Sequence, residues 1–78
     1  MEAIIYSTDA CPYCRQAKEY LKARNVPFIE KNVALDRIAA QEMVQRSQQS
    51  GVPVLVINGQ VIVGFDRRRI DAALALSE

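Results

Sequence analysis

The chain has 78 residues, half of them apolar, a length that suits one small hydrophobic core, so we expect a single domain over residues 1–78. Ten basic and nine acidic residues leave a net charge of +1, which argues against broad affinity for nucleic acid or anionic membranes. No apolar run is long enough to cross a membrane, and Met1-Glu2-Ala3 leads into strand-like sequence without a basic leader. The sequence therefore predicts a cytoplasmic protein, which we expect to be a monomer.

The first part of the chain alternates strand and helix patterns. Residues 3–7 (AIIYS) are branched and aromatic, as in a buried strand. Pro12 suits the first turn of a helix, which apolar residues at helical spacing extend to about residue 24. Residues 27–30 predict a second strand, and a helical crossover between two strands implies a parallel pair with a right-handed connection.

The second part predicts a helix, a hairpin and a closing helix. Residues 35–48 form an amphipathic pattern. Between the apolar runs 54–57 and 60–63, Asn58-Gly59 supplies the two positive-φ residues of a type I′ turn. Asp66 is the expected N-cap of a last helix that ends near residue 76. The order β-α-β-α-β-β-α predicts an α/β fold with a four-stranded mixed sheet flanked by three helices.

Large apolar residues on these elements predict the core. Its expected members are Phe28, Ile29, Leu35, Ile38, Met43, Leu55, Ile57, Ile62, Ile70 and Leu74.

Both cysteines lie in Cys11-Pro12-Tyr13-Cys14, between the first strand and the first helix. As N-cap and third helical residue, their Cβ atoms would be about 5–6 Å apart, close enough to bridge after small adjustments. The sulfur of Cys11 would face the free N–H groups and the positive end of the helix dipole, which favour the thiolate. We therefore expect Cys11 to be the nucleophile, with Arg15 adding a nearby positive charge. Cys14, one turn further and less exposed, is the expected resolving thiol.

The cysteine pair could also hold a metal or form a permanent disulfide. A zinc site needs four ligands, and two cysteines without any histidine would require two chains to share the ion. A purely structural disulfide closing so small a loop would stabilise the fold little. Because disulfides in reducing compartments are more often catalytic or redox-sensing, the sequence favours reversible redox chemistry without a bound metal.

With C-P-Y-C after the first strand, Val52-Pro53 before the third, and Gly64 and Asp66 before the last helix, the sequence resembles the glutaredoxins, small members of the thioredoxin-fold superfamily. The resemblance covers nearly the whole chain. It implies that Pro53 is cis and faces the disulfide, and that the backbone of Val52 pairs with the cysteinyl part of bound glutathione. It also implies that Asp66 binds the γ-glutamyl end. The implied set of glutathione- or substrate-binding residues is Tyr13, Val52, Pro53, Gly64, Phe65 and Asp66.

The implied activity is glutathione-dependent thiol-disulfide exchange, which reduces protein disulfides and glutathione mixed disulfides through Cys11 and Cys14. Glutathione would be a co-substrate rather than a tightly bound cofactor. The expected partners are disulfide-containing or glutathionylated proteins, with ribonucleotide reductase as one candidate, and glutathione reductase as the indirect electron source.

Four departures from the family pattern narrow the expected glutathione site. Gly51 replaces a usual Thr, Val63 the first of two glycines, Arg67 a second acidic residue, and Thr8 a frequent basic residue. One alternative is therefore a redoxin of the NrdH group, recharged by thioredoxin reductase, which Gly64-Phe65 resembles. Another is a glutathione-ligated [2Fe–2S] carrier, although Pro12 is associated in the family with redox activity more than with cluster binding.

Three arginines, Arg67-Arg68-Arg69, occupy the first turn of the last predicted helix. Positive charge there opposes the helix dipole by about 0.3–1 kcal/mol per residue at low salt. Two interpretations are open: the run is a solvated face, the ordinary role of such charges, or it attracts an acidic partner or the carboxylates of glutathione.

Overall fold

Four strands form one mixed sheet in the computed structural model, which describes residues 3–76. In chain order the elements are β1 (Ala3–Ser7), α1 (Pro12–Ala23), β2 (Ile29–Asn32), α2 (Arg37–Ser47), β3 (Val54–Ile57), β4 (Gln60–Val63) and α3 (Arg67–Ala75). The strands lie in the order β2-β1-β3-β4, with β1 and β2 parallel and the other pairs antiparallel. The predicted fold class and element order are confirmed.

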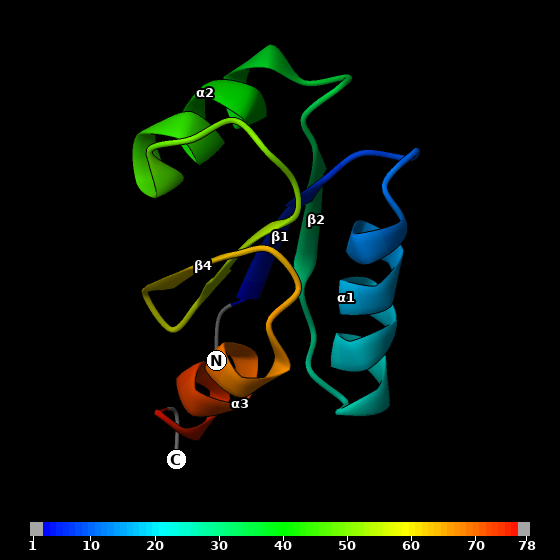
Figure 1. Ribbon diagram of the computed structural model, residues 1–78, viewed down its shortest axis with the longest axis vertical. Coiled ribbons are helices and arrows are strands. Elements are labelled where there is room, and N and C mark those ends of the chain that lie inside the picture. Colours follow the sequence, from blue (N-terminus) through cyan, green and yellow to red (C-terminus); the bar gives the residue numbers. More distant parts are fainter. Residues whose placement is uncertain (1–2, 77–78) are drawn as a thin grey trace.

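The helices divide between the two faces of the sheet, with α1 and α3 on one side and α2 on the other (Figure 1). Side chains alternate along each strand, so Ile5 and Leu55 pack under α1 and α3. Tyr6 and Val54 point to the opposite face and pack with Met43 of α2. Both clusters are buried, which explains why β1 and β3 read as almost continuous apolar runs.

The hairpin between β3 and β4 forms where the sequence predicts it. Asn58 and Gly59 have φ values of 51° and 82°, the left-handed region that both central residues of a type I′ turn require. The side-chain amide of Asn58 donates to the carbonyl of Ala73 at 3.0 Å, so the turn is also tied to α3.

Two element boundaries differ from the prediction. The second strand covers Ile29–Asn32 instead of 27–30. The second helix, α2, covers Arg37–Ser47 instead of 35–48. It begins after Asp36, whose carboxylate accepts the N–H of Ala39 at 3.1 Å, and it ends at Gln48, whose backbone is in the left-handed conformation. The side-chain cap at Asp36 satisfies a free helical N–H group, which fixes the start later than apolar spacing alone suggests.

Six predicted core residues are buried: Met43, Leu55, Ile57, Ile62, Ile70 and Leu74. Phe28 is partly buried against the cluster under α1 and α3.

The prediction was wrong for three residues, because Ile29 is 60% exposed, Leu35 82% and Ile38 69%. Ile29 lies on the edge strand β2, which has a neighbour on one side only. Leu35 precedes the N-cap of α2, and Ile38 is one residue away from the buried stripe formed by Ala39 and Met43. One residue turns a helix by about 100°, enough to move a side chain from the core to solvent.

Two polar clusters hold helices in place. Tyr20 of α1 and Arg24, the C-cap residue of that helix, both hydrogen-bond to the carboxylate of Asp71 on α3. On the opposite face, Glu42 of α2 accepts from the hydroxyl of Tyr6 at 3.0 Å and from Lys31 at 2.8 Å. Between residues 3 and 76, no helix has the length and apolar character needed to span a bilayer.

Candidate active site

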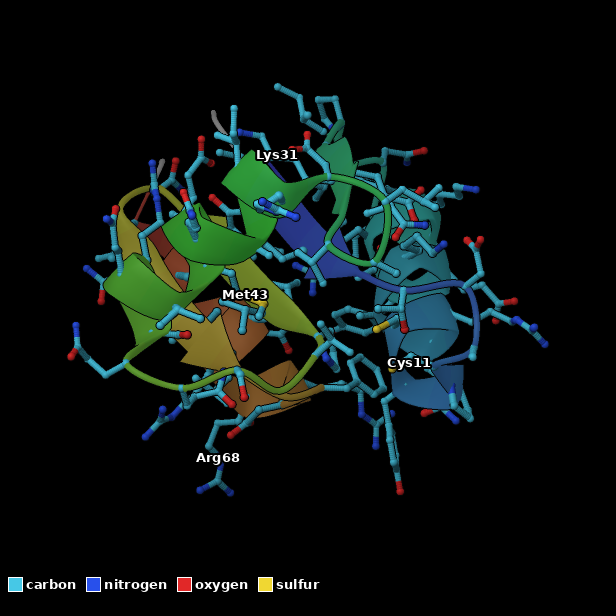
Figure 2. The ribbon with its side chains drawn as sticks, turned by 90° about the horizontal axis from the view of Figure 1, so that it is seen from above. Cys11, Lys31, Met43 and Arg68 are labelled. Carbon is cyan, nitrogen blue, oxygen red and sulfur yellow. The ribbon has the colours of Figure 1, made fainter. Side chains whose placement is uncertain are left out.

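Cys11 is the N-cap of α1, as predicted, and it lies at the start of that helix in Figure 2. Its extended backbone lets the sulfur turn back, so that Sγ accepts the N–H of Cys14 at 3.1 Å. Pro12 follows in the first helical turn, where backbone N–H groups have no partner within the helix, so the N–H that proline lacks costs no helical hydrogen bond. The Cys11 side chain is partly exposed, and its thiol lies 3.9 Å from the carbonyl oxygen of Val52. This sulfur is therefore both accessible and directed at the neighbouring loop.

Cys14 has the opposite environment, because its side chain is fully buried. Burial, and next the hydrogen bond with Cys11, raise the pKa of the Cys14 thiol to about 11. A backbone hydrogen bond from Thr8 and the positive charge of Lys18 act in the opposite direction. Both cysteines are free thiols in this structure, and the protected one remains protonated at neutral pH.

Two loops meet beside Cys11. The Val52-Pro53 peptide bond is cis, as the resemblance implies, and Pro53 is buried. The carbonyl of Pro53 accepts the N–H of Gly64 at 2.8 Å, and Gly64 has a φ of 85°, which favours glycine. The contact from Cys11 to Val52 and the bond from Pro53 to Gly64 join three segments that are far apart in the sequence.

The other predicted binding residues have different environments. Tyr13 is 62% exposed, next to Cys11 in the active-site motif. The ring of Phe65 packs edge-on against Tyr20 with centroids 5.9 Å apart. Asp66 is confirmed as the N-cap of α3, where its carboxylate accepts the N–H of Arg69 at 3.2 Å and lies 3.8 Å from the guanidinium. Ligand contact by any of these side chains stays a prediction.

One departure from the family pattern has a structural consequence. The side chain of Gln49 folds over Gly51, accepting its N–H at 2.7 Å and donating to its carbonyl at 3.0 Å. A Cβ at Gly51 would lie 2.9 Å from the Gln49 amide oxygen. The usual Thr would thus have to displace this side chain, and the backbone next to Val52 is already hydrogen-bonded.

Sequence reasoning missed a polar cluster behind Cys14. Glu30 of β2 accepts from the buried hydroxyl of Ser7 at 2.8 Å and from the ammonium of Lys18 at 2.7 Å. Lys18 could have been recognised, because it follows Cys14 by four residues on one helix face. Glu30 could not, because its place depends on the register that pairs Ile5 with Glu30.

Comparison with known proteins agrees with this geometry. The glutaredoxin family model matches residues 3–62. A glutaredoxin-like 8.6 kDa protein in a rubredoxin operon of Clostridium pasteurianum is 52% identical over 67 residues, covering 86% of this chain and 89% of that protein. Glutaredoxin 3 of Escherichia coli (strain K12) is 37% identical over 62 residues, covering 80% and 75%.

Solved structures show the same fold. The crystal structure of the thioredoxin-like protein BC3987 superposes with a TM-score of 0.85 at 30% identity, covering 91% of this chain and 97% of that chain. NrdH-redoxin from Escherichia coli superposes with a TM-score of 0.83 at 24% identity, covering 92% and 93%.

The mixed sheet, the cis proline and the dithiol at a helix N-terminus define a thioredoxin-like thiol-disulfide oxidoreductase. The match to the family model and the identity with glutaredoxin-like relatives define this class more narrowly. The chain belongs to the glutaredoxin family.

Proposed function

We propose that the protein is a glutathione-dependent oxidoreductase that reduces protein disulfides and glutathione mixed disulfides through Cys11 and Cys14. The observation that carries the proposed thiol-disulfide chemistry is the contrast between the two thiols. Cys11 is accessible at a helix N-cap, whereas Cys14 is buried and its pKa is raised to about 11. An exposed thiolate attacks substrates, and a protected thiol serves the later intramolecular step.

In the first step the Cys11 thiolate attacks one sulfur of a substrate disulfide. A Cys11 mixed disulfide forms, the substrate S–S bond breaks, and one substrate thiolate leaves and takes a proton. In the second step Cys14 or glutathione attacks the mixed disulfide and releases the other substrate thiol. Glutathione then restores the Cys11 and Cys14 thiols, and NADPH reduces the resulting glutathione disulfide through glutathione reductase.

The loops beside Cys11 supply the groups for binding. Backbone groups at Val52 would hold the cysteinyl part of glutathione in strand-like fashion. Gly64 and Phe65 would contribute the adjacent backbone, and Asp66 at the start of α3 would receive the charged γ-glutamyl end. Tyr13 would cover the exposed side of the Cys11 sulfur. Glutathione is a co-substrate in this scheme, and the protein needs no tightly bound cofactor.

The proposed partners are cytoplasmic proteins that carry disulfides or glutathionylated thiols, with ribonucleotide reductase as a candidate. The exposed run Arg67 to Arg69 would favour acidic partners, and Figure 2 shows Arg68 projecting away from the body of the molecule. Reaction rates that fall with added salt would support this role. Unchanged rates and salt dependence after neutralising all three arginines would refute it.

A second candidate is a redoxin recharged by thioredoxin reductase. The observation that favours it is the Gln49 side chain, which occupies both backbone groups of Gly51 beside the proposed glutathione site. Its replacement by Ala would free these groups. If Gln49 obstructs glutathione, Gln49→Ala raises glutathione-dependent turnover, and if it does not, turnover stays unchanged.

A coupled assay separates the two candidates. NADPH consumption with a small mixed disulfide is measured once with glutathione and glutathione reductase, and once with thioredoxin reductase. Turnover only with glutathione supports the main proposal, and turnover only with thioredoxin reductase refutes it in favour of the second.

Two serine variants test the roles of the thiols. Cys11→Ser is expected to abolish all activity. Cys14→Ser is expected to retain deglutathionylation, which needs one thiol, and to lose reduction of protein disulfides. Disulfide reductase activity that survives in Cys11→Ser would overturn the nucleophile assignment.

A further inference from the structure

The cluster behind Cys14 combines residues from three elements. Lys18 lies on α1 one turn after Cys14, and its ammonium is 2.7 Å from Oε2 of Glu30 on β2. The hydroxyl of Ser7, at the end of β1, donates to the same oxygen at 2.8 Å. Ser7 is fully buried and precedes Thr8, whose backbone hydrogen-bonds the Cys14 thiol. The cluster therefore fixes the position of an ammonium group on the residue one helical turn after Cys14, and its charge acts on that thiol.

Stability alone gives little reason for this arrangement. The side chains of Lys18 and Glu30 are 24% and 38% exposed, and ion pairs of that exposure contribute about 0–1 kcal/mol. A buried serine hydroxyl needs a partner, but a neutral acceptor would satisfy it equally well. Neither packing nor hydrogen bonding therefore requires that this pair be charged.

The charges of Lys18 and Glu30 can act in the resolving step, in which Cys14 attacks the mixed disulfide. To break the mixed disulfide, Cys14 must lose its proton to solvent, attack Sγ of Cys11 and form the Cys11–Cys14 disulfide. At the same time the Cys11–substrate bond breaks, and the substrate leaves as a thiolate that takes up a proton from solvent. Negative charge develops on a buried sulfur before the attack, and a nearby cation stabilises it. We propose that Lys18, oriented by Glu30 and Ser7, is a positioning residue that promotes ionisation of Cys14 in this step.

The charged groups around Cys14 predict in which direction the pH dependence of the resolving step shifts in each variant. Cys11 and Lys18 face the thiol from α1, and Glu30 of β2 faces Lys18 and reduces its field. Lys22, also on α1, acts on Glu30. Removal of the Lys18 cation should therefore move resolution to higher pH, whereas removal of the Glu30 carboxylate should move it to lower pH. A cluster with a merely structural role would shift both variants in the same direction or neither.

Reaction with an aromatic disulfide that releases a coloured thiol separates the two steps in a stopped-flow experiment. The first burst of colour reports attack by Cys11, and the second reports resolution by Cys14. Lys18→Met is expected to leave the first phase unchanged and to slow the second by about three- to tenfold at neutral pH, equivalent to a shift of about half to one pH unit in the ionisation of Cys14. Lys18→Arg is expected to restore the rate.

The matched control is Lys22→Met, which removes the same charge from the same helix and should leave both phases unchanged. Glu30→Gln should move the second phase to lower pH. The inference rests on the proposed roles of Cys11 and Cys14, which the variant Cys14→Ser tests separately. A second phase that survives in this variant refutes those roles. A normal second phase in the parent together with an unchanged pH profile in Lys18→Met refutes the inference alone, as does a shift to higher pH in Glu30→Gln.

Discussion

The environment of Cys14 predicts that only one of the two thiols can be alkylated in the folded protein. The thiolate is the reactive species, and a pKa of about 11 leaves about one Cys14 in 10⁴ ionised at pH 7. The side chain also has no exposed surface. Iodoacetamide should therefore modify Cys11 rapidly and Cys14 only after unfolding.

The variant Cys11→Ser isolates the buried thiol. It removes the hydrogen bond with Cys11, the second cause of the raised pKa, but retains burial, which is the first. In the parent protein, the rise from an ordinary pKa of 9.0 to about 11 alone slows labelling of Cys14 by about 100-fold, and burial, the largest cause of that rise, persists in the variant. Mass spectrometry of this variant at neutral pH should show no adduct in the time that the parent protein takes to gain one.

Denaturant provides the control, because unfolded Cys11→Ser should be labelled within that same time. Circular dichroism of the folded variant would show that it retains its secondary structure. Rapid labelling of Cys14 in the folded variant, at a rate independent of unfolding, would refute the argument that burial protects this thiol.

Three further predictions concern the rest of the fold. Met43→Ala should lower the free energy of unfolding by about 2–5 kcal/mol in urea titrations, because it opens a cavity beneath α2, and a loss below about 1 kcal/mol would contradict this. Asp66→Ala and Asp36→Ala should each lower the free energy of unfolding by about 0.5–2 kcal/mol, because each removes a helix N-cap. Only Asp66→Ala should also raise the KM for glutathione. Equal KM values in the two variants would show that Asp66 does not bind glutathione. Hydrogen bonds from Lys31 and Tyr6 lower the pKa of Glu42 in the folded protein. The Glu42 carboxylate therefore stabilises the fold above its unfolded pKa near 4.5, and this contribution is lost as the pH falls through the lower folded pKa. Glu42→Gln should flatten the acid unfolding curve in that pH range.

The sequence predicts those parts of the fold that short-range patterns determine. Asn58-Gly59 specifies its own turn, and Asp66 specifies the start of α3, because each depends on the local backbone. The errors at Ile29 and Ile38 have another origin. Their exposure depends on which strand lies at the edge of the sheet and on the rotation of α2, and both are set by tertiary packing.

The candidate site divides in the same way. The position of Cys11 as an N-cap follows from the Cys-Pro sequence at a helix start. The cis bond at Pro53 is expected only through the family resemblance, since most X-Pro bonds are trans. The pairing of Lys18 with Glu30 has no signal in the sequence beyond helical spacing, because it requires the register of two parallel strands.

Three of the four departures from the family pattern, Gly51, Val63 and Arg67, lie on the ligand side of the site, and the fourth, Thr8, lies beside Cys14. The thiol side keeps Cys11 at the helix N-cap, Cys14 buried, and a cis proline next to them. The ligand side differs, because Gln49 closes over the backbone of Gly51 and positive charge follows Asp66. In the proposed function, thiol-disulfide exchange would depend on the first side and the choice of reductant on the second. Changes confined to the ligand side would therefore alter which molecule recharges the protein and leave its chemistry unchanged.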